Sequence, residues 1–151
     1  YYARLIDWAD EVTRAETLQE AAVGTAEMAA ACGNCHMALD RTAPFSLAAS
    51  PPPAVPAAGH MLRHLWSADR LWEGLMGPSD DLWGFGALTL SDEALGFEEV
   101  AGSELVQELA DRVHRLGIEA DGAIGQGDRA EVYGRLLVSY TPLTLPTLHP
   151  G

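Results

Sequence analysis

The sequence predicts an all-α protein, a bundle of about four to six helices that forms a single domain over residues 1–151. Apolar residues recur at helical spacing through most of the chain, and no stretch shows the two-residue alternation of a half-buried strand. Of the 151 residues, 48% are hydrophobic and 21% are charged, which is typical of one globular domain. We therefore expect one hydrophobic core.

The first two helices are predicted at the beginning of the chain. Apolar residues at helical spacing predict a helix over about residues 2–15. Thr17 is followed by Glu20, which is the capping-box pattern that begins a helix. The second helix is therefore expected to start after Thr17 and to run through Met28 towards Cys32.

A proline-rich loop, residues 40–56, is predicted to separate the second helix from the third. Its five prolines deny the backbone a regular helix, because proline lacks the amide hydrogen and clashes with the preceding turn. The third helix is expected from Ala57 to Met76. The Gly77-Pro78 pair that follows is a strong stop signal.

Three further helices complete the prediction. Ser79 is placed to cap a short fourth helix, and Ser103 is placed to cap a fifth. Several glycines then interrupt the chain before a last helix over about residues 128–139. The tail, residues 141–151, is expected to be irregular because it contains three prolines.

The charge of the chain restricts its partners. Nine basic residues, all of them arginine, stand against 22 acidic residues, for a formal net charge of -13. Such a surface repels phosphate backbones, so nucleic acid is not an expected partner. A basic patch on another protein is an expected partner, because opposite charges attract. No apolar run reaches the roughly 18 residues that a transmembrane helix needs.

The segment Cys32-Gly33-Asn34-Cys35-His36 matches the C-x-x-C-H signature of covalent haem attachment. Positions three apart place both thiols on one side of a helical turn, and the next residue brings an imidazole towards the same side. On these five residues the chain resembles c-type cytochromes. The resemblance implies one haem c, bonded through Cys32 and Cys35, with His36 as the proximal iron ligand and the helical bundle packed around the haem.

Other chemistry of the same cysteine pair fits the sequence less well. A thioredoxin-like site needs a strand before its helix, and no βαβ pattern is present. A structural zinc site needs two further ligands, and there is no second cysteine pair. A disulfide that closes so short a loop would constrain the unfolded chain little.

The distal iron ligand cannot be transferred from a subfamily. The motif lies early in the chain, as in class I cytochromes c, but the long helical remainder departs from the class I pattern. Cytochromes c' carry the motif on their last helix, so this chain departs from their pattern as well. The third predicted helix supplies the candidates. Its apolar face includes His64, which is therefore the predicted distal ligand, with Met61 and His60 as alternatives. A hydrogen bond from His64 to a carbonyl or to a haem propionate is the competing interpretation.

The same helical projection separates apolar from charged side chains along the third helix. Arg63, Arg70 and Glu73 are predicted to lie opposite the apolar face. Besides His64, that face is expected to hold six apolar side chains: Met61, Leu65, Ala68, Leu71, Trp72 and Leu75.

The resemblance implies a one-electron carrier rather than an enzyme. Its partners would be redox proteins or a membrane electron-transfer complex, and its location would be the periplasm or another extracytoplasmic space, where haem c is attached. One alternative is a five-coordinate haem that binds or senses nitric oxide or carbon monoxide. Another is a haem-relay or structural subunit of a larger electron-transfer complex.

Overall fold

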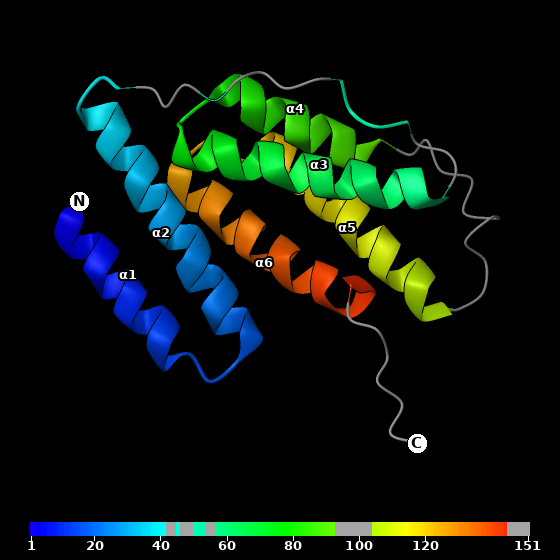
Figure 1. Ribbon diagram of the computed structural model, residues 1–151, viewed down its shortest axis with the longest axis horizontal. Coiled ribbons are helices and arrows are strands. Elements are labelled where there is room, and N and C mark those ends of the chain that lie inside the picture. The colour runs from blue at the N-terminus through cyan, green and yellow to red at the C-terminus, as the bar shows by residue number, and fades with distance from the viewer. Residues whose placement is uncertain (42–44, 46–49, 54–56, 93–103, 145–151) are drawn as a thin grey trace.

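The computed structural model is all-helical, which confirms the predicted fold class (Figure 1). It describes the chain except residues 42–44, 46–49, 54–56, 93–103 and 145–151, and the part described contains no strand. The six helices in chain order are α1 (Tyr2–Arg14), α2 (Leu18–Ala38), α3 (Ala57–Met76), α4 (Asp80–Ser91), α5 (Glu104–Gly122) and α6 (Gln126–Thr144).

Helices α1 and α2 form an antiparallel hairpin along one side of the other four helices (Figure 1). The predicted capping box is confirmed: the Thr17 hydroxyl accepts from the Glu20 amide at 3.2 Å, and the Glu20 carboxylate accepts from the Thr17 amide at 3.1 Å. Gly24 allows the two helices to approach closely, because a Cβ there would lie 2.7 Å from the Val12 side chain. The α1–α2 hairpin therefore depends on the Thr17–Glu20 capping box at its turn and on Gly24, which allows the two helices to pack closely.

Helix α4 packs on α3 and α5, α6 packs on α5 and α3, and α2 packs on α6 and α3. Ser79 caps α4 as predicted, since its hydroxyl accepts from the Leu82 amide at 3.3 Å. The guanidinium of Arg129 on α6 donates to the Asp80 carboxylate at 2.7 Å and so ties α6 to the start of α4. The predicted bounds of α3, Ala57 to Met76, are confirmed.

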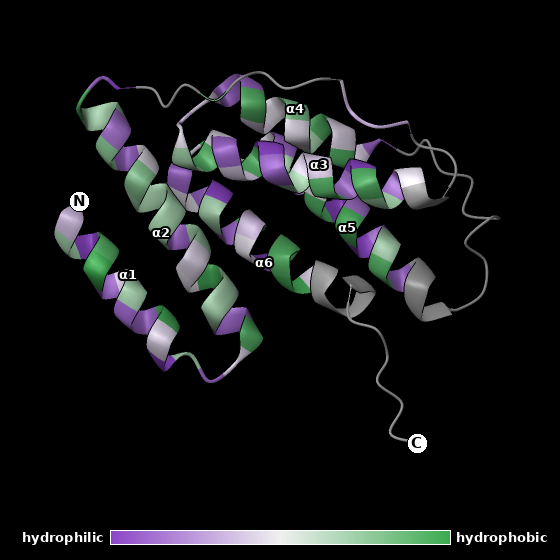
Figure 2. Cartoon of the chain, viewed as in Figure 1, coloured by the Kyte–Doolittle hydropathy of each residue, from purple (hydrophilic) through white to green (hydrophobic). Residues whose placement is uncertain are grey.

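The core joins five of the six helices. Helix α1 has no buried residue and lies as an amphipathic helix on the outer side of α2. Figure 2 shows the hydropathy of each helix. In α2 the buried side chains are small, which lets neighbouring helices come close. The largest contributions to the core come from Leu71, Leu75, Trp83, Val113, Leu116, Tyr133 and Leu136.

Some predicted details differ in the structure. Helix α6 continues to Thr144, so residues 141–144 are helical and the irregular tail predicted for 141–151 is wrong over these four. The residues beyond 144 and the predicted cap at Ser103 lie outside the described residues.

The predicted faces of α3 are also partly wrong. Leu65 is 47% exposed and so does not belong to the buried apolar face, and Arg70 is buried at 8% exposure and so does not belong to the exposed polar face. Arg70 is stabilised there by Glu73, at 2.8 Å, and lies over the Trp66 ring. Among the described residues, none of the helices has the length and apolar character needed to cross a membrane.

Candidate functional site

Cys32, Cys35 and His36 lie on the last turns of α2 and share one hollow with the beginning of α1. Both cysteines are free and half-buried. The hollow holds about 170 Å³ and is open to the outside. Its other walls are apolar or aromatic side chains, from Tyr1, Tyr2, Leu5 and Ala31.

His36 is oriented by a helix that is distant in the sequence. Its Nδ1 lies 3.0 Å from the backbone carbonyl of Met76, in the last turn of α3. A carbonyl only accepts, so Nδ1 must carry the proton and donate it. The carbonyl is one of those that a helix leaves unsatisfied at its end. The Nε2 lone pair of His36 is therefore left for a metal, in the arrangement by which proteins orient metal-binding imidazoles.

Gly33, between the two cysteines, allows the ends of α2 and α3 to meet. A Cβ at this position would lie 2.3 Å from the Leu75 carbonyl oxygen and 3.1 Å from the Gln126 side-chain amide. No side chain tolerates the first of these distances, so only glycine permits this approach. The contact brings the Met76 carbonyl within reach of His36.

The electrostatics of the site favour the neutral form of the Cys32 thiol. Burial raises the pKa of the Cys32 thiol above its ordinary value, and the neighbouring Cys35 raises it further. Cys32 is therefore protonated at neutral pH, whereas a metal ligand or a reactive nucleophile is a thiolate. Within the described residues there is no cluster of three or more His, Cys, Asp and Glu side chains arranged to hold a metal ion.

The three candidate distal ligands are not brought to this site. His64, the nearest of them along α3, precedes Met76 by twelve residues, which is roughly 18 Å along the helix axis. Its side chain also leans towards the helix N-terminus, away from Met76. Met61 and His60 lie one further turn away. In this arrangement none of the three side chains lies beside His36.

His60 and His64 instead lie against each other. Their ring centroids are 3.9 Å apart, and the ring planes make an angle of 61°. His64 is buried and His60 is half-buried. Burial lowers the pKa of His64 to about 3, with further lowering by His60 and Arg63, and burial together with Arg63 lowers the pKa of His60. Both imidazoles are thus neutral at neutral pH.

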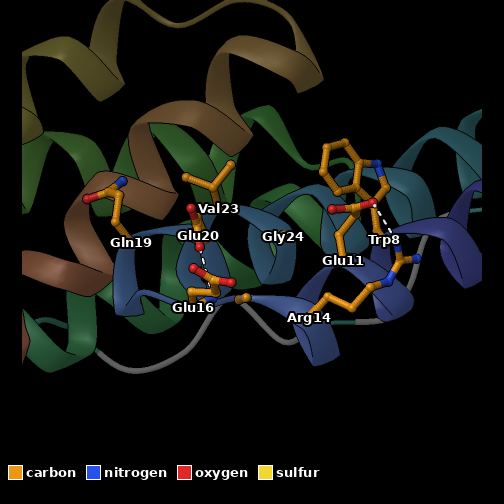
Figure 3. A pocket seen from close by; sticks show the side chains of 9 residues that line it. Trp8, Glu11, Arg14, Glu16, Gln19, Glu20, Val23 and Gly24 are labelled. Atoms are coloured by element: carbon orange, nitrogen blue, oxygen red, sulfur yellow. Dashed lines mark hydrogen bonds and ion pairs between the residues drawn. The ribbon is translucent and has the colours of Figure 1, made fainter.

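A larger hollow of about 470 Å³ lies at the other end of the α1–α2 hairpin (Figure 3). Glu20 is engaged there in the capping box, and Arg14 forms an ion pair with Glu11 at 3.6 Å. These polar groups already satisfy one another, and neither a cysteine nor a histidine lines the hollow. The larger volume therefore does not mark the chemical site.

Sequence reasoning missed the two features that orient His36: the close approach at Gly33 and the Met76 carbonyl. The Gly77-Pro78 stop signal did indicate that carbonyls near Met76 would lack helical partners. No local pattern indicated that one of them would meet His36, forty residues earlier in the chain.

Comparison of the chain with protein-family models, curated proteins and solved structures finds no match.

Proposed function

We propose that the protein is a c-type haem protein that transfers single electrons between redox partners. The observation that supports it best is the orientation of His36. Its Nδ1 donates to the Met76 carbonyl, and its Nε2 remains available beside two free thiols on the same turns of α2. These are the groups that attachment of one haem c requires.

Each residue has a separate task in this proposal. Cys32 and Cys35 would each hold the haem through a thioether bond, formed when the S–H group adds across a vinyl double bond, sulfur to one carbon and hydrogen to the other. These additions need no oxidant and release no leaving group. His36 would hold the iron through Nε2, and its hydrogen bond to the Met76 carbonyl orients the ring and increases its basicity.

A bound haem supplies a one-electron couple between ferric and ferrous iron. The residues around the haem would determine how closely a redox partner can approach it. Cys32, Cys35 and His36 are all half-buried, and the hollow of about 170 Å³ is smaller than a typical ligand pocket of roughly 300–1,000 Å³. A larger group would extend beyond the described walls, where a partner protein can approach it.

The acidic surface fits a basic docking partner. With a net charge of -13, the chain would attract a positively charged patch and speed the encounter at low salt. An extracytoplasmic location, most simply a bacterial periplasm, accompanies this proposal because covalent haem attachment takes place there.

A second candidate function, binding of small gases such as nitric oxide or carbon monoxide, is favoured by the position of α3. His60, Met61 and His64 do not reach the site of His36, and the described walls of the hollow offer no other imidazole or thioether to iron. An iron held by His36 alone would be able to bind a gas.

The test is the chain produced together with a haem c attachment system. We expect one haem per chain that survives denaturation, and no covalent haem in a Cys32→Ser/Cys35→Ser variant. A His114→Asn variant, altered on the distant α5, should retain its haem. A reduced low-spin spectrum that carbon monoxide leaves unchanged would support the electron carrier, and rapid carbon monoxide binding would support the gas-binding candidate. A colourless chain with two titratable thiols would contradict both.

A further inference from the structure

The outward side of α4 carries two large apolar side chains that are exposed. Phe85 is 53% exposed and Leu88 is 67% exposed, although residues of these types are usually buried by folding. Together with Asp80, Asp81 and Gly84 they line an open hollow of about 350 Å³. A Cβ at Gly84 would meet nothing within 4 Å, so the hollow has room for a side chain from another molecule.

Helix α3 continues this apolar surface, because it packs along α4. The ring of Trp66 lies at the edge of the Phe85 ring, with centroids 6.3 Å apart and an angle of 65° between the ring planes. Leu62 is 57% exposed and Leu65 is also exposed, and residues at this spacing are neighbours of Trp66 on a helical surface. Two helices therefore share one exposed apolar surface, the α3–α4 face, which consists of Leu62, Leu65, Trp66, Phe85 and Leu88. A contiguous apolar surface of this kind, unlike scattered single residues, marks an interaction site.

The charges beside the α3–α4 face are acidic. Asp81 lines the hollow, and Asp69 is exposed four positions after Leu65, on the same side of α3. Neither aspartate has an ion-pair partner among the described residues. The two arginines of α3 are each engaged in an ion pair with a carboxylate of this chain. Positive charge on the binding partner would therefore complement this face.

We propose that the α3–α4 face binds the apolar side of a basic amphipathic helix on a partner protein. Two packed helices leave a shallow groove between them, and the side chains of a third helix fit such a groove. Apolar side chains of the partner helix would contact Phe85 and Leu88 and fill the hollow above Gly84. Lysine or arginine side chains on its flanks would meet Asp69 and Asp81. The inference rests on the proposed function only in expecting a basic partner, and it requires no haem.

Charge favours this occupant over two others. A second copy of the chain would bring the same aspartates and a net charge of -13, so like charges would oppose the pairing of two α3–α4 faces. An anionic lipid surface would be repelled for the same reason. A basic helix gains electrostatic attraction where both of these lose it.

The test measures the binding of a fluorescein-labelled peptide to the full chain by fluorescence anisotropy. The peptide is a helix of about five turns, with leucine along one side and lysine along the other. We expect one peptide to bind per chain, and the affinity to fall as salt is added. Phe85→Gln and Leu88→Gln should each weaken binding about tenfold or more, because buried apolar anchors carry most of the energy of an interface. Asp81→Asn should weaken it less, because a charge at the rim contributes less than an anchor.

A blocking variant tests the same face without removing an apolar side chain. Gly84→Gln adds a polar side chain where the helix surface is open, so it leaves the core undisturbed and favours the helix. This variant should remain folded by circular dichroism and should bind the peptide about tenfold more weakly, because the hollow is filled.

Matched controls lie on the α1–α2 hairpin. Leu18 is 53% exposed, as Phe85 is, and Asp7 is exposed. Leu18→Gln and Asp7→Asn should bind the peptide as the unaltered chain does. Peptides with the same leucines scattered around the helix, or with glutamate in place of lysine, should not bind.

Three results would overturn the proposal. The first is equal affinity in Phe85→Gln, Leu88→Gln and the unaltered chain, and the second is an equal loss of affinity in Leu18→Gln. The third is a dimer in sedimentation velocity that Phe85→Gln abolishes, because the occupant would then be a second copy. Covalent haem, measured separately, tests the proposed function and should not differ between these variants.

Discussion

Replacement of Gly33 by alanine tests how α2 and α3 position His36. The new Cβ would lie 2.3 Å from the Leu75 carbonyl oxygen, whereas carbon and oxygen normally stay at least about 3.3 Å apart. The two backbones must separate by roughly 1 Å to relieve this overlap. The hydrogen bond of 3.0 Å between His36 and Met76 would then lengthen to roughly 4 Å, beyond hydrogen-bonding distance.

Opposing energies decide the stability of Gly33→Ala. Alanine favours a helix interior over glycine by about 0.5–1 kcal/mol. Overpacking costs about 1–3 kcal/mol, and the lost hydrogen bond costs about 1 kcal/mol more. We therefore expect a net destabilisation of about 1–3 kcal/mol, measured by urea unfolding and circular dichroism.

The matched control for this substitution is Gly84→Ala on α4, where an added Cβ meets nothing within 4 Å. This variant should be about 0.5–1 kcal/mol more stable than the unaltered chain, because only helix propensity changes. In haem-loaded Gly33→Ala, the weaker hydrogen bond should make His36 a poorer donor to iron and raise the reduction potential. A Gly33→Ala protein as stable as the Gly84→Ala protein, with an unchanged potential, would refute the reasoning.

Two further predictions concern the helix cap and the buried histidine. Thr17→Ala removes the hydroxyl that accepts in the capping box and should lower the free energy of unfolding by about 1 kcal/mol. Thr13→Ala should cost less, because the Thr13 hydroxyl only donates to the Asp10 carbonyl on an exposed part of α1. The pKa of His64 is lowered to about 3, so the unfolded chain binds more protons than the folded chain between about pH 3 and 6.5. The stability of the metal-free protein should therefore rise with pH across this window, by about 1–2 kcal/mol between pH 5 and 6.5, and His64→Asn should flatten that slope. Equal unfolding free energies for the two threonine variants, or an unchanged pH slope in His64→Asn, would contradict these interpretations.

Some features were predictable because their causes are local. The start of α2 follows from Thr17 and Glu20, three residues apart, and the start of α4 follows from Ser79. The end of α3 follows from the Gly77-Pro78 pair. Each depends on backbone geometry within one turn, which short segments of sequence encode.

The faces of α3 were less predictable because they depend on neighbouring helices. A helical projection assumes one buried side, but α3 packs against α4 and also against α2 and α6. Arg70 is buried among these contacts with Glu73 as its partner, while Leu65 is left outside. The periodicity of the sequence indicates only that one face of the helix is apolar. The arrangement of the neighbouring helices decides which residues of α3 are buried.

The sequence by itself determined an all-helical chain, the ends of several helices and the proximity of two thiols and an imidazole within five residues. Only the tertiary structure decided that the His36 ring meets the Met76 carbonyl, and that His60, Met61 and His64 lie together but roughly 18 Å or more along α3 from that contact. The reason is physical: turns and caps depend on neighbours in the chain, whereas distances between helices depend on how whole faces pack.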